Sequence, residues 1–197
     1  AVRYVGGTGF QPDLVWIKSR DHTYGHHWTD SVRGAGKDLY SDTTDAENSN
    51  ANSLQSFESD GFTLGTDNGP NNSTKHYVAW TWDMGGSNAN NTTGSIDSVV
   101  RANATYGQSI VSYTGSNSAG TVGHGLSSAP EFIITKRRNA ASNWGVYHTS
   151  NGATKYQLLN STEAVGTATA MWNDTAPTNS VFSVGTDNDT NGSSKTY

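Results

Sequence analysis

Short stretches in which apolar and polar residues alternate recur along this chain, and each is bounded by Gly, Asn, Asp or Ser. In residues 13–20, Trp16 and Lys18 share one face of an extended chain, and Val15 and Ile17 share the other. Both faces are apolar at the start, which predicts a central strand with two covered faces. The same pattern predicts further strands at residues 26–32, 37–41, 53–59, 62–65 and 77–82.

Two features refine this first series of strands. Asp60-Gly61 separates two of them and favours a tight β-hairpin turn. The strand at 77–82 carries one Val and two Trp on one face, and we expect this face in the core because it would otherwise leave a large apolar area in water. The polar residues 43–52 are predicted to form a loop.

The chain carries one motif twice. Residues 62–77 read FTLGTDNGPNNSTKHY and residues 182–197 read FSVGTDNDTNGSSKTY, with nine of the sixteen positions identical. Upstream, residues 12–46 match residues 130–164 at a constant offset of 118, whereas the motif itself repeats at an offset of 120. Two residues have therefore entered a loop of the second copy. The repeat indicates an internal duplication.

The duplication predicts two modules, residues 1–84 and 96–197, joined by a Gly/Asn/Thr-rich linker at 85–95. Strands of the second module are expected at residues 96–100, 108–114, 131–138, 144–150 and 155–159. The first module's version of the strand at 108–114 is either missing or reduced to residues 2–5. The second copy lacks a counterpart of residues 78–82, so we expect its last strand to be missing and the chain to be a segment of a longer polypeptide.

Composition favours an all-β fold. Hydrophobic residues make up 32% and charged residues 15% of the chain, Gly occurs 22 times, and the usual helix formers are scarce. With the short strands and frequent turns, this predicts two tandem antiparallel β-sandwiches of jelly-roll or lectin-like type.

Charge and cysteine content exclude several classes of protein. The net charge of −5, with only 12 Lys and Arg, argues against a nucleic-acid partner. No apolar run approaches a membrane span, and the absence of Cys excludes disulfides and thiolate chemistry.

The densest basic cluster, residues 136–138, is interpreted as a solvated strand end because it follows an apolar run. Lys18 and Arg20 repeat the K-x-R pattern in the first copy. We interpret these two residues as a solvated rim or as members of an ion pair, and the alternative is a basic pair that contacts a ligand.

Catalytic motifs are absent from the chain. There is no G-x-S-x-G elbow and no H-E-x-x-H. Glu58 and Asp60 would share one face of a strand, as the paired carboxylates of β-sandwich glycosidases do, but no further acidic residue lies nearby. The aligned residues of the second copy are Thr178 and Ser180, and we assign no catalytic residue.

One candidate metal site stands out. Asp187, Asp189 and Asn191 match the D-x-D-x-N-G opening of an oxygen-ligand calcium loop. The Glu that closes such loops is absent, and an Asx-rich turn explains both copies without a metal. Calcium is the one cofactor considered.

The long motifs PDLVWIKSRD, H-x-x-D-S-V-R-G-A-G-K, YVAWTWDMGG and SAPEFIITKRRN are similar to a domain of unassigned function in marine bacteriophage virion and tail-fibre-like proteins. The resemblance implies a concanavalin-like β-sandwich in a virion structural protein, in an appendage that touches the host. It brings no catalytic residues.

These observations favour a non-enzymatic virion module at the particle surface, a fibre, spike or decoration protein. Its expected partners are itself in a homo-oligomer, other virion proteins and a host surface glycan. The alternative is a carbohydrate-binding or adhesion module of a secreted bacterial protein. A third reading is a glycan-degrading enzyme that uses Glu58 and Asp60.

Overall fold

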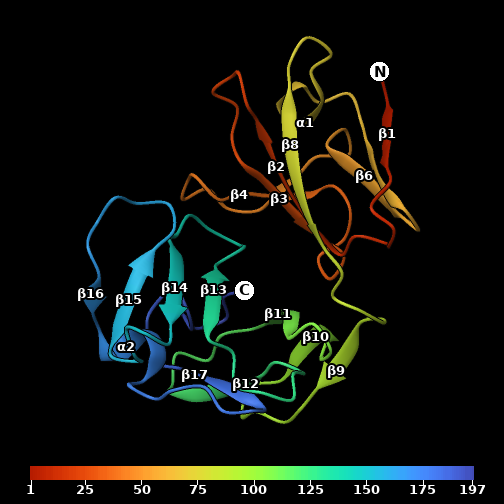
Figure 1. The fold of residues 1–197 in the computed structure, drawn as a ribbon. Helices are drawn as coiled ribbons and strands as arrows, with labels where there is room; N and C mark the ends of the chain where they lie inside the picture. The colour runs from red at the N-terminus through yellow and green to blue at the C-terminus, as the bar shows by residue number, and fades with distance from the viewer. The chain divides into compact units, whose positions relative to one another are not determined.

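The computed structural model describes residues 1–197, which divide into two compact units, Ala1–Met84 and Gly85–Tyr197 (Figure 1). Short strands dominate both units, and every pairing between named strands is antiparallel. Each unit has one helix of four residues. The predicted β-rich, nearly helix-free class is therefore confirmed. No helix has the length and apolar character needed to cross a membrane.

The first unit contains a five-stranded sheet of order β5-β4-β3-β2-β8 and a three-stranded sheet of order β1-β7-β6. Its elements are β1 (Arg3–Gly6), β2 (Leu14–Ser19), β3 (His27–Asp30), β4 (Lys37–Tyr40), β5 (Asn48–Ser49), β6 (Leu54–Glu58), β7 (Gly61–Leu64), α1 (Asn68–Asn71) and β8 (Tyr77–Trp82). Figure 1 shows β8 beside β2 in the larger sheet.

Alternation along β2 decides which side of the larger sheet is the core. Val15 and Ile17 are buried and pack in one apolar cluster with Leu54, Phe62 and Leu64 from the smaller sheet. Burial of side chains of this size contributes about 1.5–3 kcal/mol each. The opposite face of β2 carries Trp16 and Lys18.

The predicted hairpin is present as β6 and β7. Gly61 has φ +154°, and a Cβ added there would overlap the carbonyl oxygen of Val5, so the turn requires glycine. The Asp60 carboxylate accepts hydrogen bonds from the amides of Gly7 and Gly9, at 3.2 and 2.6 Å. The turn thereby holds the loop that follows β1.

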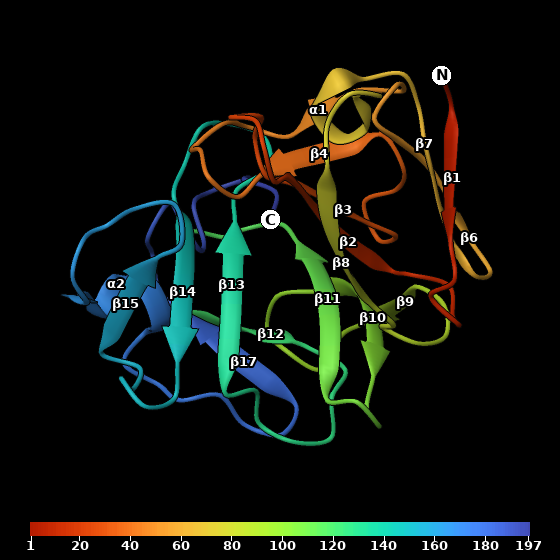
Figure 2. The same ribbon diagram turned by 45° about the horizontal axis from the view of Figure 1, so that its top comes forward.

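The second unit contains three sheets, of order β11-β10-β9, β12-β17 and β13-β14-β15-β16 (Figure 2). Its elements are β9 (Ala89–Asn91), β10 (Ser98–Asn103), β11 (Gln108–Tyr113), β12 (Gly120–Gly123), β13 (Phe132–Lys136), β14 (Trp144–His148), β15 (Lys155–Leu158), β16 (Gly166–Thr167), α2 (Thr169–Trp172) and β17 (Val181–Val184). One apolar cluster is centred on Val122 and Phe182, and another surrounds Met171 and Trp172 of α2.

The structure differs from the predicted linker at residues 85–95. Strand β9 lies within this segment and pairs with β10, and the Arg101 side chain donates to the carbonyls of Gly85 and Gly86, at 3.0 and 2.7 Å. These bonds make the segment part of the second unit. The predicted loop at 43–52 likewise contains the two-residue strand β5, which pairs with β4.

Strand β1 has a different counterpart from the one the sequence suggested. It pairs with β7, as β12 pairs with β17, whereas β11 pairs with β10. The pairing of β1 therefore corresponds to that of β12, so residues 2–5 are not a reduced version of residues 108–114, and of the two alternatives only the missing strand remains. Strand position in a sheet depends on its partner, and a four-residue strand carries too little sequence to identify that partner.

Candidate functional site

Four tryptophans form one surface on the first unit, on the side of the five-stranded sheet opposite the apolar cluster. The register sets Trp16 directly between Trp28 on β3 and Trp80 on β8. Ring centroids are 5.3 Å apart in both pairs, and Trp82 stacks on Trp28 at 6.4 Å. We call these four residues the tryptophan face.

The tryptophan face corrects the expectation that Trp80 lies in the core. Trp80 is 46% exposed, because the core contacts of this sheet come from Val15 and Ile17 on its other side. The Trp16 indole nitrogen donates to the Ser41 hydroxyl at 3.0 Å, which fixes the central ring. Alternation in β2 was the available signal, because it separates Trp16 from Val15 and Ile17. The exposed Trp80 ring, with the half-buried Trp16 and Trp28 rings beside it, can contact an apolar part of a ligand.

A buried polar group lies on the core side of the same sheet. His27 Nδ1 is 3.2 Å from Asp38 Oδ2, and the Thr29 hydroxyl donates to Asp38 Oδ1 at 2.6 Å. Burial raises the pKa of the Asp38 carboxyl, but the hydrogen bonds from His27 and Thr29 outweigh it, and the pKa lies below its usual value. Ionised Asp38 therefore stabilises the first unit at pH values above the pKa that this carboxyl has in the unfolded chain. The stabilisation is lost as the pH falls through the lower pKa that it has in the folded protein. The Thr29 hydroxyl and the His27 ring both bind the Asp38 carboxylate, and we assign this buried group a structural role.

The first copy of the repeated motif is a compact turn around α1. The Asp67 carboxylate accepts from the Gly69 amide at 2.7 Å, and the Asn71 side-chain amide donates to the Gly65 carbonyl at 2.6 Å. The Tyr77 hydroxyl donates to one backbone carbonyl of the turn and accepts from one backbone amide, each at 2.9 Å. These polar residues therefore satisfy the backbone of a short helical turn.

The second copy makes the same contacts. The Asp187 carboxylate accepts from the Asp189 amide at 2.8 Å, and the Asn191 side-chain amide donates to the Gly185 carbonyl at 2.6 Å. The Tyr197 hydroxyl donates to a carbonyl at 2.8 Å and accepts from an amide at 2.6 Å. Identical residues thus have identical hydrogen-bond roles in the two units.

The three candidate calcium ligands are engaged within this second turn. The Asp189 carboxylate accepts from the Ser142 hydroxyl at 2.7 Å and from the amide and side chain of Asn143 at 3.2 and 3.3 Å. Asn191 is fully buried, and its side-chain oxygen accepts a backbone amide at 2.8 Å. No group of three or more His, Cys, Asp or Glu is arranged to hold a metal ion. Hydrogen bonds within the protein account for the positions of Asp187, Asp189 and Asn191, and calcium binding stays a prediction.

Glu58 and Asp60, the paired carboxylates of the glycan-degrading alternative, also have hydrogen-bond partners within the protein. Glu58 Oε1 accepts from the hydroxyls of Ser56 and Thr63, at 2.5 and 3.1 Å. Asp60 binds the backbone of the loop after β1, as described above. The two carboxylates therefore have separate hydrogen-bond partners: Glu58 binds two side-chain hydroxyls, and Asp60 binds two backbone amides.

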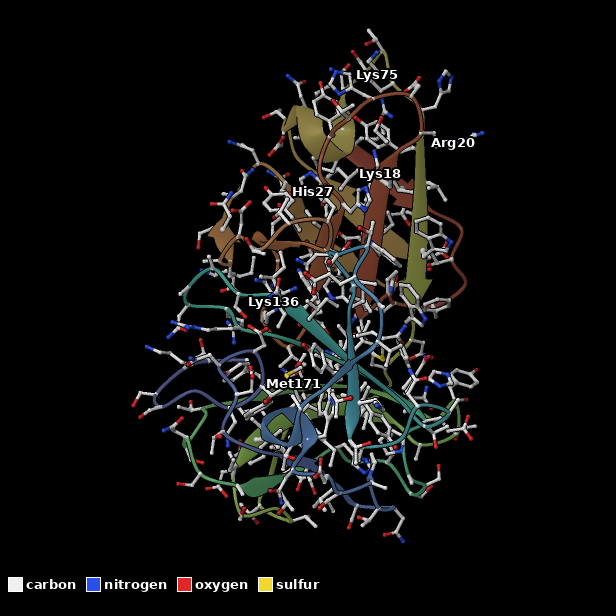
Figure 3. The ribbon with its side chains drawn as sticks, turned by 90° about the vertical axis from the view of Figure 1, so that its left-hand side faces the viewer. Lys18, Arg20, His27, Lys75, Lys136 and Met171 are labelled. Atoms are coloured by element: carbon white, nitrogen blue, oxygen red, sulfur yellow. The ribbon has the colours of Figure 1, made fainter.

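The basic strand ends differ from the predicted solvated rim. Lys136 is only 5% exposed, its ammonium group donates to the Ser142 carbonyl at 2.6 Å, and it lies over the Trp144 ring at 5.9 Å. Lys18 also donates to backbone carbonyls, whereas Arg20 is exposed at the end of β2 and extends away from it (Figure 3). In both units, backbone carbonyls close to the strand end accept hydrogen bonds from the lysine ammonium group, and their dipoles stabilise its positive charge.

His124 is a buried histidine in the second unit. Its Nδ1 accepts from the Leu126 amide at 3.1 Å, and its Nε2 is 3.2 Å from the Thr178 carbonyl. Both contacts are satisfied by the neutral ring with the proton on Nε2. Burial lowers the pKa of His124 below its usual value, against the raising effect of the Thr178 carbonyl.

We expect the second unit to lose stability as the pH falls below about 6.5, where the unfolded histidine binds a proton before the folded one does. His124→Gln keeps a donor near Thr178 and removes the titration, so its stability should vary less with pH between about 5 and 7. Urea unfolding at several pH values measures this difference. His22→Gln, on an exposed loop, is the control and should retain the pH dependence of the unaltered chain. Parallel curves for His124→Gln and the unaltered chain would contradict the assignment.

Comparison with known proteins identifies the class to which this β-rich chain belongs. A family model described as "Domain of unknown function (DUF7483)" matches residues 1–197, and the chain is a member of that family. Neither the curated proteins nor the solved structures contain a match. Function must therefore be argued from the side chains themselves.

Proposed function

We propose that this protein is a non-enzymatic structural module at the surface of a bacteriophage virion, a fibre, spike or decoration protein, whose first unit binds host surface glycan through the tryptophan face. The observation that carries the proposal is the row formed by Trp80, Trp16 and Trp28 on an outer sheet surface, with Trp80 nearly half exposed. The resemblance of the long sequence motifs to virion and tail-fibre-like proteins supports the setting.

The chemistry of the tryptophan face suits a sugar chain. A pyranose ring presents an apolar C–H surface that stacks on an indole, while its hydroxyls remain hydrated or meet nearby polar groups. The sheet spaces successive indoles at 5.3 Å and tilts their planes by 53° and 44°, so the rings form an apolar surface that is not flat but is in place before a ligand binds. An exposed aromatic surface on an otherwise polar chain is a recognised mark of a binding site.

Removing the exposed ring tests the proposal. Trp80→Ala should weaken binding to the glycan that scores highest on a glycan array by about tenfold or more, which corresponds to about 1.4 kcal/mol. Isothermal titration with that glycan measures the change. Tyr106→Ala, which removes an aromatic side chain that is 66% exposed on the second unit, should leave the affinity unchanged. The proposal would be contradicted if no glycan on the array bound the protein, or if the two variants had equal affinity for the glycan.

We further propose that both units are lectin-like β-sandwiches descended from one duplicated module. Supporting this, the two copies of the motif make the same hydrogen bonds, and β1 with β7 pairs as β12 does with β17. In a virion the protein would act as a homo-oligomer alongside other virion proteins, because fibres and decorations are symmetric assemblies. Light scattering on the native protein tests this part, and a monomer would contradict it.

A further inference from the structure

A small pocket lies beside the second copy of the repeated turn. Its volume is about 360 Å³, within the range of about 300–1,000 Å³ that is usual for small-molecule sites. The lining residues come from β15, the loop that follows it, α2 and the turn that contains Asp187 and Asp189. Figures 1 and 2 both show α2 beside β15. The pocket therefore belongs wholly to the second unit and shares no residue with the tryptophan face.

Backbone hydrogen bonds show which residues of the two units correspond at this pocket. The Asn50 amide donates to the Gly36 carbonyl at 2.8 Å, and the Ala168 amide donates to the Thr154 carbonyl at 3.2 Å. Both pairs are related by the offset of 118 residues that relates the segments upstream. Ala168 therefore occupies the position in the second unit that Asn50 occupies in the first.

This replacement leaves one carboxylate oxygen of the second turn without a partner. In the first unit the side-chain amide of Asn50 donates to Oδ2 of Asp67. Alanine has no donor, and the one hydrogen bond of the Asp187 carboxylate is accepted by Oδ1, from the Asp189 amide at 2.8 Å. Ala168 and Asp187 both line the pocket. The pocket thus lies where the first unit places an amide donor, and its acceptor is unused.

The lining of the pocket is acidic. It includes the carboxylates of Glu163, Asp187 and Asp189, and it includes no lysine, arginine or histidine. None of these three carboxylates forms an ion pair within the protein. The attraction between such groups and a cation is stronger in a pocket than in open water, because the effective dielectric constant is lower there. A ligand of this pocket should therefore carry a positive charge.

The other walls suit a ring that carries hydroxyl groups. The Tyr156 ring is held against Gly166, where an added Cβ would overlap its Cζ and hydroxyl, and that hydroxyl has no hydrogen-bond partner within the protein. Asn160 and Ser161 add a side-chain amide and a hydroxyl. The acidic residues do not form a group that could hold a metal ion. An organic cation that offers both a C–H surface and hydroxyls fits these walls better than a bare ion does.

We propose that this pocket binds an amino sugar whose amino group is free and protonated. The ammonium group binds Oδ2 of Asp187, in the place that the Asn50 amide takes in the first unit, and the sugar ring lies against Tyr156. A lysine side chain would satisfy the carboxylates but would leave Asn160 and Ser161 without a ligand partner. The class of ligand rests on the glycan binding proposed above, whereas the site is independent of the tryptophan face.

Titration of the full chain with methyl β-glucosaminide, followed by NMR, tests the proposal. The side-chain amide resonances of Asn143 and Asn160 should shift and saturate, with a dissociation constant of about 1 mM or lower. The N-acetylated sugar has the same ring without the charge and should bind at least about tenfold more weakly. Trp80→Ala should bind the amino sugar as the unaltered chain does, so a failure of this site and a failure of the tryptophan face give different results.

Two substitutions test the role of the unused oxygen. Asp187→Asn keeps an acceptor for the Asp189 amide but removes the charge, and it should weaken binding by about tenfold or more. Ala168→Asn restores the amide of the first unit, which should occupy Oδ2 of Asp187 and abolish binding while urea unfolding shows an intact fold. Ala176→Asn, at an exposed position outside the pocket, is the matched control and should keep full affinity.

Three results would overturn the proposal: shifts that do not saturate, equal affinity for the N-acetylated sugar, or unchanged binding by Ala168→Asn. Tighter binding of Nα-acetyl-lysine methylamide than of the amino sugar would also overturn it, in favour of a lysine side chain of a partner protein as the occupant.

Discussion

Replacing Asn191 by alanine is expected to lower the free energy of unfolding of the second unit by about 3–5 kcal/mol. Its side-chain amide donates to the carbonyls of Gly185 and Ser118 at 2.6 and 2.7 Å, and its oxygen accepts from the Ser116 amide at 2.8 Å. The residue is completely buried, so alanine removes three hydrogen bonds and leaves the buried Gly185 carbonyl without this partner, whereas the Ser118 carbonyl keeps its bond from the Ser116 hydroxyl. The lost hydrogen bonds and the cavity that the truncated buried side chain leaves together make this a large change for a single substitution.

Urea unfolding followed by far-ultraviolet circular dichroism measures the loss. Asn188→Ala is the matched control, because Asn188 is exposed in the same turn and contributes its backbone carbonyl, which alanine keeps. The control should change stability by less than about 0.5 kcal/mol. Equal losses in the two variants would show that the turn, and not the buried amide, carries the effect.

Gly65→Ala is expected to destabilise the first unit by about 3 kcal/mol. A Cβ at this position would overlap the carbonyl oxygen of Asn52, which is backbone and cannot rotate aside. Relief of the overlap must separate two segments that are joined by the bonds from Gly65 to Ser53, at 2.7 Å, and from Asp67 to Asn52, at 2.9 Å. The equivalent Gly185 faces the carbonyl of Ala170 in the same way, which explains why both copies of the motif carry glycine.

Thermal unfolding separates this steric cost from the general cost of replacing glycine. Gly34 has φ +98° with no atom near its added Cβ, so Gly34→Ala should cost only the strain of a left-handed backbone, about 1–2 kcal/mol. A melting temperature for Gly65→Ala at or above that of Gly34→Ala would refute the close-approach explanation.

Local patterns were sufficient to locate most strands of the first unit. The predicted strand at 77–82 has the bounds of β8, and the hairpin at Asp60-Gly61 is present, because alternation and turn chemistry act between near neighbours in sequence. Strands β5 and β9 were not predicted, because segments of two or three mostly polar residues are too short to show a hydrophobic alternation. Their pairing depends on partners that the fold supplies.

The candidate site was harder to predict than the strands. Alternation placed Trp80 and Trp82 on one face correctly but could not say whether that face met the core or solvent. The core side is chosen by Val15, Ile17 and the smaller sheet that packs on them. Lys136 was misassigned for a related reason, because the loop that covers it lies six residues further along the chain.

The sequence by itself determined the β-rich class, the repeat and the polar turn that the repeat encodes, because these follow from spacing along the chain. The tertiary structure alone decided that the tryptophan face lies on the side of the first sheet away from its apolar cluster, with Trp80 exposed. That outcome depends on which distant segments pair and pack, and neither the hydrophobic period nor the composition of a strand specifies these partners.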